Sequence, residues 1–268
     1  MAAPTHAEHH DETRAAVPTT ALGVCRMRAW ESKKPESERL IYDPFAAILC
    51  GSDSPDLPLM DEVGRTPDFW IDFIAARTRW IDEQVSCPVQ QLAILGAGLD
   101  TRAYRLESLR GLPVFEVDFP EVLNAKAKLL DGHIPIAKLT SVTANLSLNA
   151  WDKELVSNGF QKVPTMWLLE GLLGYLTQAE VEALLGQLSQ FVDADTKMTV
   201  TFVGAAILEN VTSMHRYLVS GAEEIEALLQ KFGWQCRVWS VGDIAHQYGR
   251  ADHIPADYGY YLVSAWRA

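Results

Sequence analysis

The first residues that could do chemistry are two glycines that directly follow an apolar run. The run QLAIL leads into Gly96-Ala97-Gly98, and the segment DTRAYRL after it is typical of a helix start. Two glycines at this spacing let the chain turn tightly and let a ligand approach the backbone closely. The pattern alone fits either an ordinary strand-to-helix turn or a site for one of several nucleotide cofactors.

A carboxylate stands where a nucleoside site needs one. Asp118 ends the run VFEVD, twenty positions after Gly98. At the end of a second strand, a carboxylate can accept hydrogen bonds from both hydroxyls of a ribose. The alternative is that Asp118 caps the helix that starts near Glu121.

The residues that follow Gly98 favour S-adenosylmethionine over a dinucleotide. In the dinucleotide pattern G-x-G-x-x-G, the third glycine packs the helix beneath a pyrophosphate, and Thr101 takes that position here. Asp100 also adds a negative charge at the helix start, which suits a cationic sulfonium ligand bearing an amino group better than it suits a pyrophosphate. The sequence therefore points to a sulfonium cofactor.

Strands and helices alternate around these residues. The apolar and alternating runs predict seven strands, at QLAIL, PVFEVDF, KLTSVTAN, TMWLLEG, KMTVTFVG, CRVWSV and GYYLVSAWR. Helical patterns separate most of them, but we find no strong helix between the last two strands, so we expect one of those two to be antiparallel. The pattern predicts an α/β fold, with a Rossmann-like, seven-stranded, mostly parallel sheet and helices on both faces.

The chain before the first strand reads as helices. Short helical segments broken by Pro35 and Pro44 precede the amphipathic helix DFWIDFIAARTRWIDEQV, which contains Arg77 and Arg79. We expect a disordered tail over residues 1–20 and one domain over 21–268. Within that domain, 21–90 would form a helical lid, and 91–268 the core with a substrate-wall insertion near 204–222.

Composition excludes several classes of protein. The net charge of −12 argues against binding to a nucleic acid backbone. The four cysteines are widely spaced and stand near no histidine set, so we expect reduced thiols and no metal. No run of about eighteen apolar residues and no signal-peptide core appears, so we expect no membrane partner and a cytoplasmic location.

Three linked motifs carry a family resemblance. The segments ILGAGLDTRAYRL, FEVDFPEVLNAK and LLEGLLGYLT resemble the leucine carboxyl methyltransferase family, as do the upstream segment TALGVCRMRAWESKKPESERLIYDPFA and the helix AARTRWIDE. The likeness runs from about residue 20 to the end and is closest to the polyketide O-methyltransferases of the tetracenomycin type. It implies a class I fold and the cofactor S-adenosyl-L-methionine.

The resemblance also implies roles for individual residues. Arg77 would clamp the methionine carboxylate of the cofactor, although a surface salt bridge to Asp72 is the alternative. Gly96 and Gly98 would pass beneath the cofactor and Asp118 would hold its ribose. Glu170, at the end of the strand MWLLE, would lie by the methionine amino group or the reaction cleft. A carboxylate in so apolar a run is costly to bury without a partner.

Three further positions are less typical. Where the family has an Asp-Leu pair that holds the adenine, this chain has Asn145-Leu146, which keeps an acceptor and loses a charge. Tyr175 resembles a residue that reaches into the reaction cleft, or it is a half-buried core tyrosine. His215, in the long connection AAILENVTSMHRYLVSGA, is a candidate general base or an ordinary polar residue.

We therefore expect an S-adenosylmethionine-dependent O-methyltransferase that acts on a carboxyl or phenolic oxygen of a small molecule. A protein C-terminal carboxylate is another possible acceptor. A non-catalytic S-adenosylmethionine-binding module and a nicotinamide-dependent oxidoreductase are the rival functions that the fold permits. The sequence does not indicate the oligomeric state.

Overall fold

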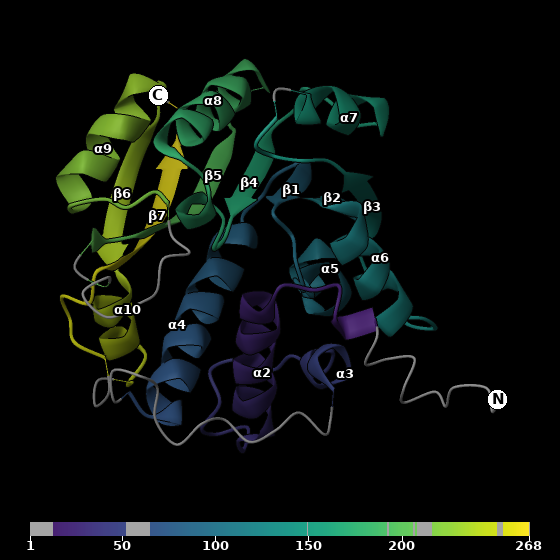
Figure 1. The fold of residues 1–268 in the computed structure, drawn as a ribbon, viewed down its shortest axis with the longest axis vertical. Coiled ribbons are helices and arrows are strands. Elements are labelled where there is room, and N and C mark those ends of the chain that lie inside the picture. Colours follow the sequence, from purple (N-terminus) through teal and green to yellow (C-terminus); the bar gives the residue numbers. More distant parts are fainter. Residues whose placement is uncertain are drawn as a thin grey trace.

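A single seven-stranded sheet forms the centre of the molecule (Figure 1). The structure is a computed structural model that describes residues 13–51, 65–148, 150–191, 193–205, 207, 216–250 and 254–267. The strands lie in the order β3-β2-β1-β4-β5-β7-β6, and only β7 runs antiparallel to its neighbours. Their bounds are Gln91–Leu95 (β1), Pro113–Asp118 (β2), Lys138–Thr143 (β3), Thr165–Leu169 (β4), Lys197–Val203 (β5), Gln235–Ser240 (β6) and Tyr260–Trp266 (β7). The predicted Rossmann-like, mostly parallel sheet is confirmed.

Helices cover both faces of this sheet. On one face the core contains Trp151, Leu184 and Leu229, and on the other face it contains Ile81 and Ile244. The strands between these layers are apolar on both sides, and every residue of β1 and β4 is buried. The helices that follow the first strand are Arg102–Arg105 (α5), Pro120–Leu129 (α6), Trp151–Ser157 (α7), Gln178–Leu188 (α8), Ala222–Lys231 (α9) and Val241–Gln247 (α10).

Helices precede the first strand in the described ranges, as the sequence predicts. Helix α2 (Thr19–Lys33) ends before Pro35, and α3 (Ala46–Cys50) begins after Pro44. Helix α4 (Pro67–Val85) starts with a proline at its first position and a Thr66 side chain that accepts the Phe69 N–H at 3.4 Å. Both α2 and α4 lie side by side below the sheet in Figure 1.

Part of the segment that we expected as a disordered tail over residues 1–20 packs against the rest of the structure. Val17 is buried, and Arg14 donates hydrogen bonds to the carbonyl oxygens of Leu49 and Ile48, both at 3.0 Å. The segment from residue 13 therefore packs against α3, because it brings an apolar side chain and a cation to the open carbonyls at the end of that helix.

The C-terminal part of the fold differs from the sequence prediction in one element. Helix α10 lies between β6 and β7, where we expected no strong helix, and the Ser240 side chain caps it by accepting the Gly242 N–H at 3.1 Å. Seven residues are too few to show a helical period, which explains the miss. The expected antiparallel strand is β7, which pairs with both β5 and β6.

No helix in the described part of the chain is long and apolar enough to cross a membrane.

Candidate active site

The glycine turn after β1 is held between two parts of the structure. Gly96 and Gly98 have φ values of +70° and +47°, which a residue with a side chain rarely adopts. A Cβ at Gly96 would lie 3.0 Å from Leu172 Cδ1, and one at Gly98 would lie 3.9 Å from Ala21 Cβ. The turn therefore passes between α2 and the segment after β4, and its positive φ values favour glycine at both positions.

Asp118 fixes this turn from the end of β2. Its Oδ2 accepts the Gly98 N–H at 2.7 Å and its Oδ1 accepts the Phe119 N–H at 2.7 Å. Burial raises the pKa of Asp118, and the two backbone N–H groups act in the opposite direction. The alternative role as a cap of α6 is wrong, because the N-cap of that helix is Phe119 and no side chain caps it. Each carboxylate oxygen retains a lone pair for a ligand hydroxyl.

Arg77 lies inside the molecule and not on its surface. Its side chain is 7% exposed, with Nε 2.9 Å from Glu170 Oε1 and Nη1 donating to the Tyr260 hydroxyl at 3.3 Å. The alternative pairing with Asp72 is wrong, because Asp72 pairs instead with Lys34 and Arg250. The Arg77 Nε makes no hydrogen bond of good geometry despite its closeness to Glu170, so this buried donor can still be satisfied by a ligand.

Glu170 follows β4 directly and has the partners that its burial requires. Its Oε1 faces Arg77, and its Oε2 accepts from Arg102 Nη1 at 2.8 Å. Burial acts to raise the pKa of Glu170, but Arg102 and Arg77 outweigh it and lower that pKa below its ordinary value. The site therefore presents an ionised carboxylate beside a guanidinium.

Arg102 is a central residue of the site that the sequence analysis did not single out. It is nearly fully buried, and it pairs with Glu170, with Asp100 and, through Nε, with Asp82 Oδ1 at 2.7 Å. Burial acts to raise the pKa of Asp100, but Arg102 and other cations lower it to about 2. The idea that Asp100 offers a free negative charge to the ligand is wrong, since Arg102 neutralises it.

Thr101 connects the same turn to the lid. Its hydroxyl donates to Asp43 Oδ2 at 2.7 Å, and Arg28 of α2 donates to Asp43 at 2.9 Å and to the Leu99 carbonyl at 2.6 Å. Thr101, which takes the position of the third glycine in the dinucleotide pattern, thus connects the turn after β1 to the N-terminal helices. Neither Arg28 nor Asp43 was foreseen, because both lie in segments that mix buried with exposed positions and give no local signal of a buried ion pair.

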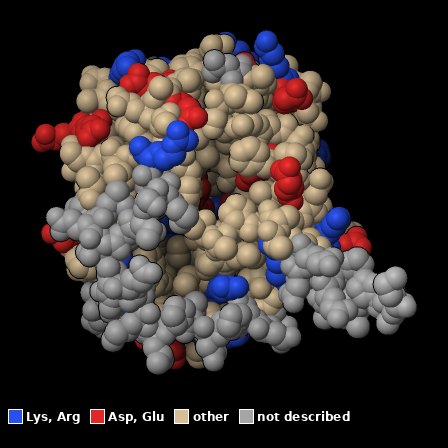
Figure 2. All heavy atoms as spheres, viewed as in Figure 1, with Lys and Arg blue, Asp and Glu red and all other residues tan. Residues whose placement is uncertain are grey.

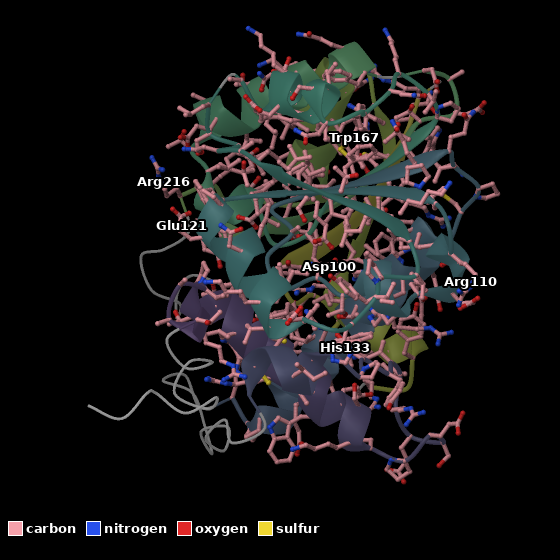
Figure 3. The ribbon with its side chains drawn as sticks, turned by 90° about the vertical axis from the view of Figure 1, so that its right-hand side faces the viewer. Asp100, Arg110, Glu121, His133, Trp167 and Arg216 are labelled. Atoms are coloured by element: carbon pink, nitrogen blue, oxygen red, sulfur yellow. The ribbon has the colours of Figure 1, made fainter. Side chains whose placement is uncertain are left out.

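Four arginines and four carboxylates form one buried arginine–carboxylate network. Its members are Arg28, Arg77, Arg102, Arg105, Asp43, Asp82, Asp100 and Glu170. Their formal charges cancel, which limits the cost of burying them. Figure 3 shows Asp100 in the interior, between the sheet and the helices below it. Figure 2 shows a hollow in the middle of one face, with acidic and basic atoms visible in its depth.

Asn145 and Leu146 lie where a third strand end would meet a ligand. The Ala144 N–H donates to the Asp118 carbonyl at 3.0 Å, which places this segment beside the end of β2. Asn145 Oδ1 accepts the Ser147 N–H at 2.9 Å, and Leu146 is buried in the core. The Asn145 oxygen is therefore oriented by a local turn and has one lone pair left for another donor.

Tyr175 ends the short helix η2 (Leu173–Tyr175), which follows β4, and its side chain is exposed. Its exposure of 38% fits both a residue that reaches into a cleft and the alternative of a half-buried tyrosine. The backbone N–H of Arg216, at the end of the long connection, donates to the Gly174 carbonyl at 2.7 Å, so that connection returns beside Tyr175. His215 lies outside the described residues. No group of three metal-ligating side chains occurs in the described ranges.

Comparison with known proteins identifies the family of this chain. Residues 21–189 match the leucine carboxyl methyltransferase family. A protein of Frankia alni is 32% identical over 256 residues, which cover 86% of this chain and 87% of that protein. One of Streptomyces coelicolor is 30% identical over 250 residues, which cover 86% and 87%. Both are assigned by name to the S-adenosyl-L-methionine-dependent methyltransferases.

Solved structures share the fold at low identity. A DUF574 family protein from Streptomyces avermitilis aligns with a TM-score of 0.61 and 14% identity, over 91% of this chain and 97% of the other. An O-methyltransferase family protein from Burkholderia thailandensis aligns with a TM-score of 0.51 and 13% identity, over 75% and 60%. The solved structures show the class I fold, and the family match with the sequence relatives shows that this chain belongs to the leucine carboxyl methyltransferase family and is an S-adenosylmethionine-dependent methyltransferase.

Proposed function

We propose that this enzyme methylates a carboxyl or phenolic oxygen of a small molecule, with the methionine end of its cofactor held by Arg77 and Glu170. The observation that carries the proposal is the ion pair between these two side chains, at 2.9 Å, beside the end of β4. The methionine end of the cofactor carries a negative carboxylate and a positive amino group. The Arg77 guanidinium complements the carboxylate, and the Glu170 carboxylate complements the amino group. The unsatisfied Arg77 Nε supports this fit.

The other cofactor contacts follow from the ends of the first three strands. The turn at Gly96 and Gly98 would lie beneath the cofactor, because it directly follows β1 and leaves its backbone open to close approach. Asp118 would accept the ribose hydroxyls with its remaining lone pairs. Asn145 would accept from the adenine amino group, with Leu146 beside it. When bound, S-adenosylmethionine supplies an electrophilic methyl group on a positively charged sulfur.

The protein's own contribution is to align the acceptor and to exclude water. Tyr175 supports an acceptor site next to Glu170, because it is exposed on the segment that leaves β4. The long connection that returns at Arg216 would form a wall of that site. A small molecule suits a site with such a wall better than a protein terminus does.

The described histidines support an acceptor that needs no strong base. His133 packs edge-on against Phe45, and His246 bonds to the Ile254 carbonyl, so both are occupied away from β4. A carboxylate is already ionised at neutral pH, whereas a phenol with a pKa near 10 must lose a proton during the reaction. These contacts favour a carboxyl acceptor or an unusually acidic phenol, unless His215 or Tyr175 acts as the base.

The pH dependence of methyl transfer tests this proposal. A screen of carboxylic acids and phenols against radiolabelled cofactor would first identify an acceptor. With a carboxyl acceptor, we expect kcat/KM to be flat from about pH 6 to 8 and His215→Ala to turn over almost normally. A rate that rises through this range, with a loss of about a hundredfold in His215→Ala, would instead establish a phenol and a histidine base. If no oxygen acceptor is found and an amine is methylated, the proposal is wrong.

A further inference from the structure

Tyr260 contacts Arg77 from a part of the fold far from the cofactor motifs. It is the first residue of β7, it is buried, and its hydroxyl lies 3.3 Å from Arg77 Nη1 and 3.0 Å from Thr201 Oγ1. Its ring packs edge-on against Phe73 of α4, with the centroids 5.0 Å apart, so the hydroxyl has little freedom to move. Tyr260 and Thr201 both lie beyond the residues 21–189 that match the family.

The direction of each hydrogen bond in this group is determined by its chemistry. A guanidinium can only donate, so the Tyr260 oxygen accepts from Arg77 and its proton goes to Thr201. The Thr201 oxygen also accepts the Gly171 N–H at 2.8 Å. Since Gly171 directly follows Glu170, the same threonine orients the turn that carries the carboxylate of the site and the tyrosine that touches its guanidinium.

The neutrality of Tyr260 matters for the site. A second carboxylate here, in addition to Glu170, would orient Arg77 but would also give it two counterions, which would weaken its attraction for a ligand carboxylate. A phenol accepts one N–H and leaves the positive charge in place. Burial alone would lower the pKa of Arg77, but Tyr260 and Glu170 outweigh burial and raise that pKa, so the guanidinium stays charged.

We propose that Tyr260 is a positioning residue for the methionine carboxylate of the cofactor: it orients the Arg77 fork and is itself oriented by Thr201. The inference rests on the proposed role of Arg77. Tyr260 does not touch the ligand in this proposal. Its hydrogen bond limits the orientations of the Arg77 side chain, so that Arg77 loses less rotational freedom when the ligand binds.

The test compares two ligands that differ only at the methionine end. S-adenosylmethionine has the amino acid group, and 5′-methylthioadenosine lacks it but keeps the adenosine. Tyr260→Phe, measured by isothermal titration calorimetry, should raise the Kd for S-adenosylmethionine about five- to tenfold, the effect of one buried hydrogen bond. The Kd for methylthioadenosine should stay within about twofold of the wild-type value.

Matched variants separate positioning from general damage. Tyr261→Phe removes a hydroxyl from the next residue of the same strand, where no hydrogen bond to Arg77 exists, and should change neither Kd. Thr201→Val should reproduce the selective loss of Tyr260→Phe, and Thr201→Ser should restore binding. A selective loss with this pattern of rescue would be unexpected if the hydroxyl only stabilised the fold.

Two outcomes would overturn the inference. One is an unchanged S-adenosylmethionine Kd in Tyr260→Phe, and the other is an equal loss for both ligands, which would indicate a structural role only. Arg77→Lys distinguishes the underlying proposal: if it weakens S-adenosylmethionine selectively while Tyr260→Phe does not, Arg77 binds the carboxylate and only the role of Tyr260 fails. If Arg77→Lys affects both ligands equally or neither, the clamp itself is wrong.

Discussion

At the scale of single residues, Asp118 has two tasks that one experiment can separate. Its two oxygens already hold the Gly98 and Phe119 N–H groups, and we propose that they also accept the ribose hydroxyls. Asp118→Ala should abolish measurable S-adenosylmethionine binding, because charged hydrogen bonds of about 1.5–3 kcal/mol each are lost and the turn is released. Asp118→Asn keeps one acceptor oxygen and should bind about tenfold or more weakly.

Calorimetry of both variants, with circular dichroism to confirm the fold, provides the measurement. Wild-type affinity in Asp118→Ala would remove this residue from the site.

The sequence identified those site residues that a strand end places locally. Gly96 and Glu170 directly follow a strand and Asp118 is the last residue of one, and parallel strands bring such positions to one edge. Arg102 and Tyr260 were missed because their role depends on partners far along the chain: Arg102 pairs with a carboxylate 68 positions away, and Tyr260 with Arg77, 183 positions away. No local pattern encodes such pairs.

At the scale of elements, the attachment of α2 to the cofactor turn is the feature to test. Thr101→Val keeps the shape of the side chain but leaves Asp43 and Arg105 without a hydroxyl partner. We expect a loss of about 1–3 kcal/mol in the free energy of unfolding, the cost of buried polar groups left unpaired. Thr101→Ser, which keeps the hydroxyl, is the matched control and should lose less.

Urea denaturation of the two variants measures this difference. If Thr101→Val and Thr101→Ser are equally stable, the hydroxyl contributes nothing to the contact between the N-terminal helices and the turn after β1.

Helices and strands with a clear apolar pattern along their length were predicted well from the sequence. The strand QLAIL and the helix DFWIDFIAARTRWIDEQV correspond to β1 and to nearly all of α4, because each has a clear apolar pattern. Helix α10 was missed since seven residues do not complete two full turns. How α2 docks on the turn after β1 was not predictable, because it depends on Arg28 reaching the Leu99 carbonyl.

At the scale of the whole molecule, the arginine–carboxylate network predicts how the protein responds to acid. The pKa of Asp100 is lowered from 3.8 to about 2, and those of Glu170 and Asp43 are lowered too. A depressed folded-state pKa gives stability that is present above about pH 4 and is lost as the pH falls toward 2. Asp100 alone contributes on the order of 2 kcal/mol to this loss. The raised pKa values of Glu116 and Asp118 offset part of it.

Chemical denaturation at pH 7, 4 and 2.5 should therefore show most of the loss in the last interval. Glu107→Gln, which breaks an exposed pair with Arg110, should leave this profile unchanged. A free energy of unfolding that stays constant down to pH 2.5 would show that the network is not stabilising.

The position of β7 has a consequence for the order of synthesis. This strand follows β6 along the chain, yet it lies inside the sheet, between β5 and β6. A growing chain on the ribosome cannot close the sheet until β7 has been made, and until then β5 and β6 have open edges that can pair wrongly. Because Tyr260 is part of β7, the guanidinium of Arg77 acquires its tyrosine partner only when this strand is in place.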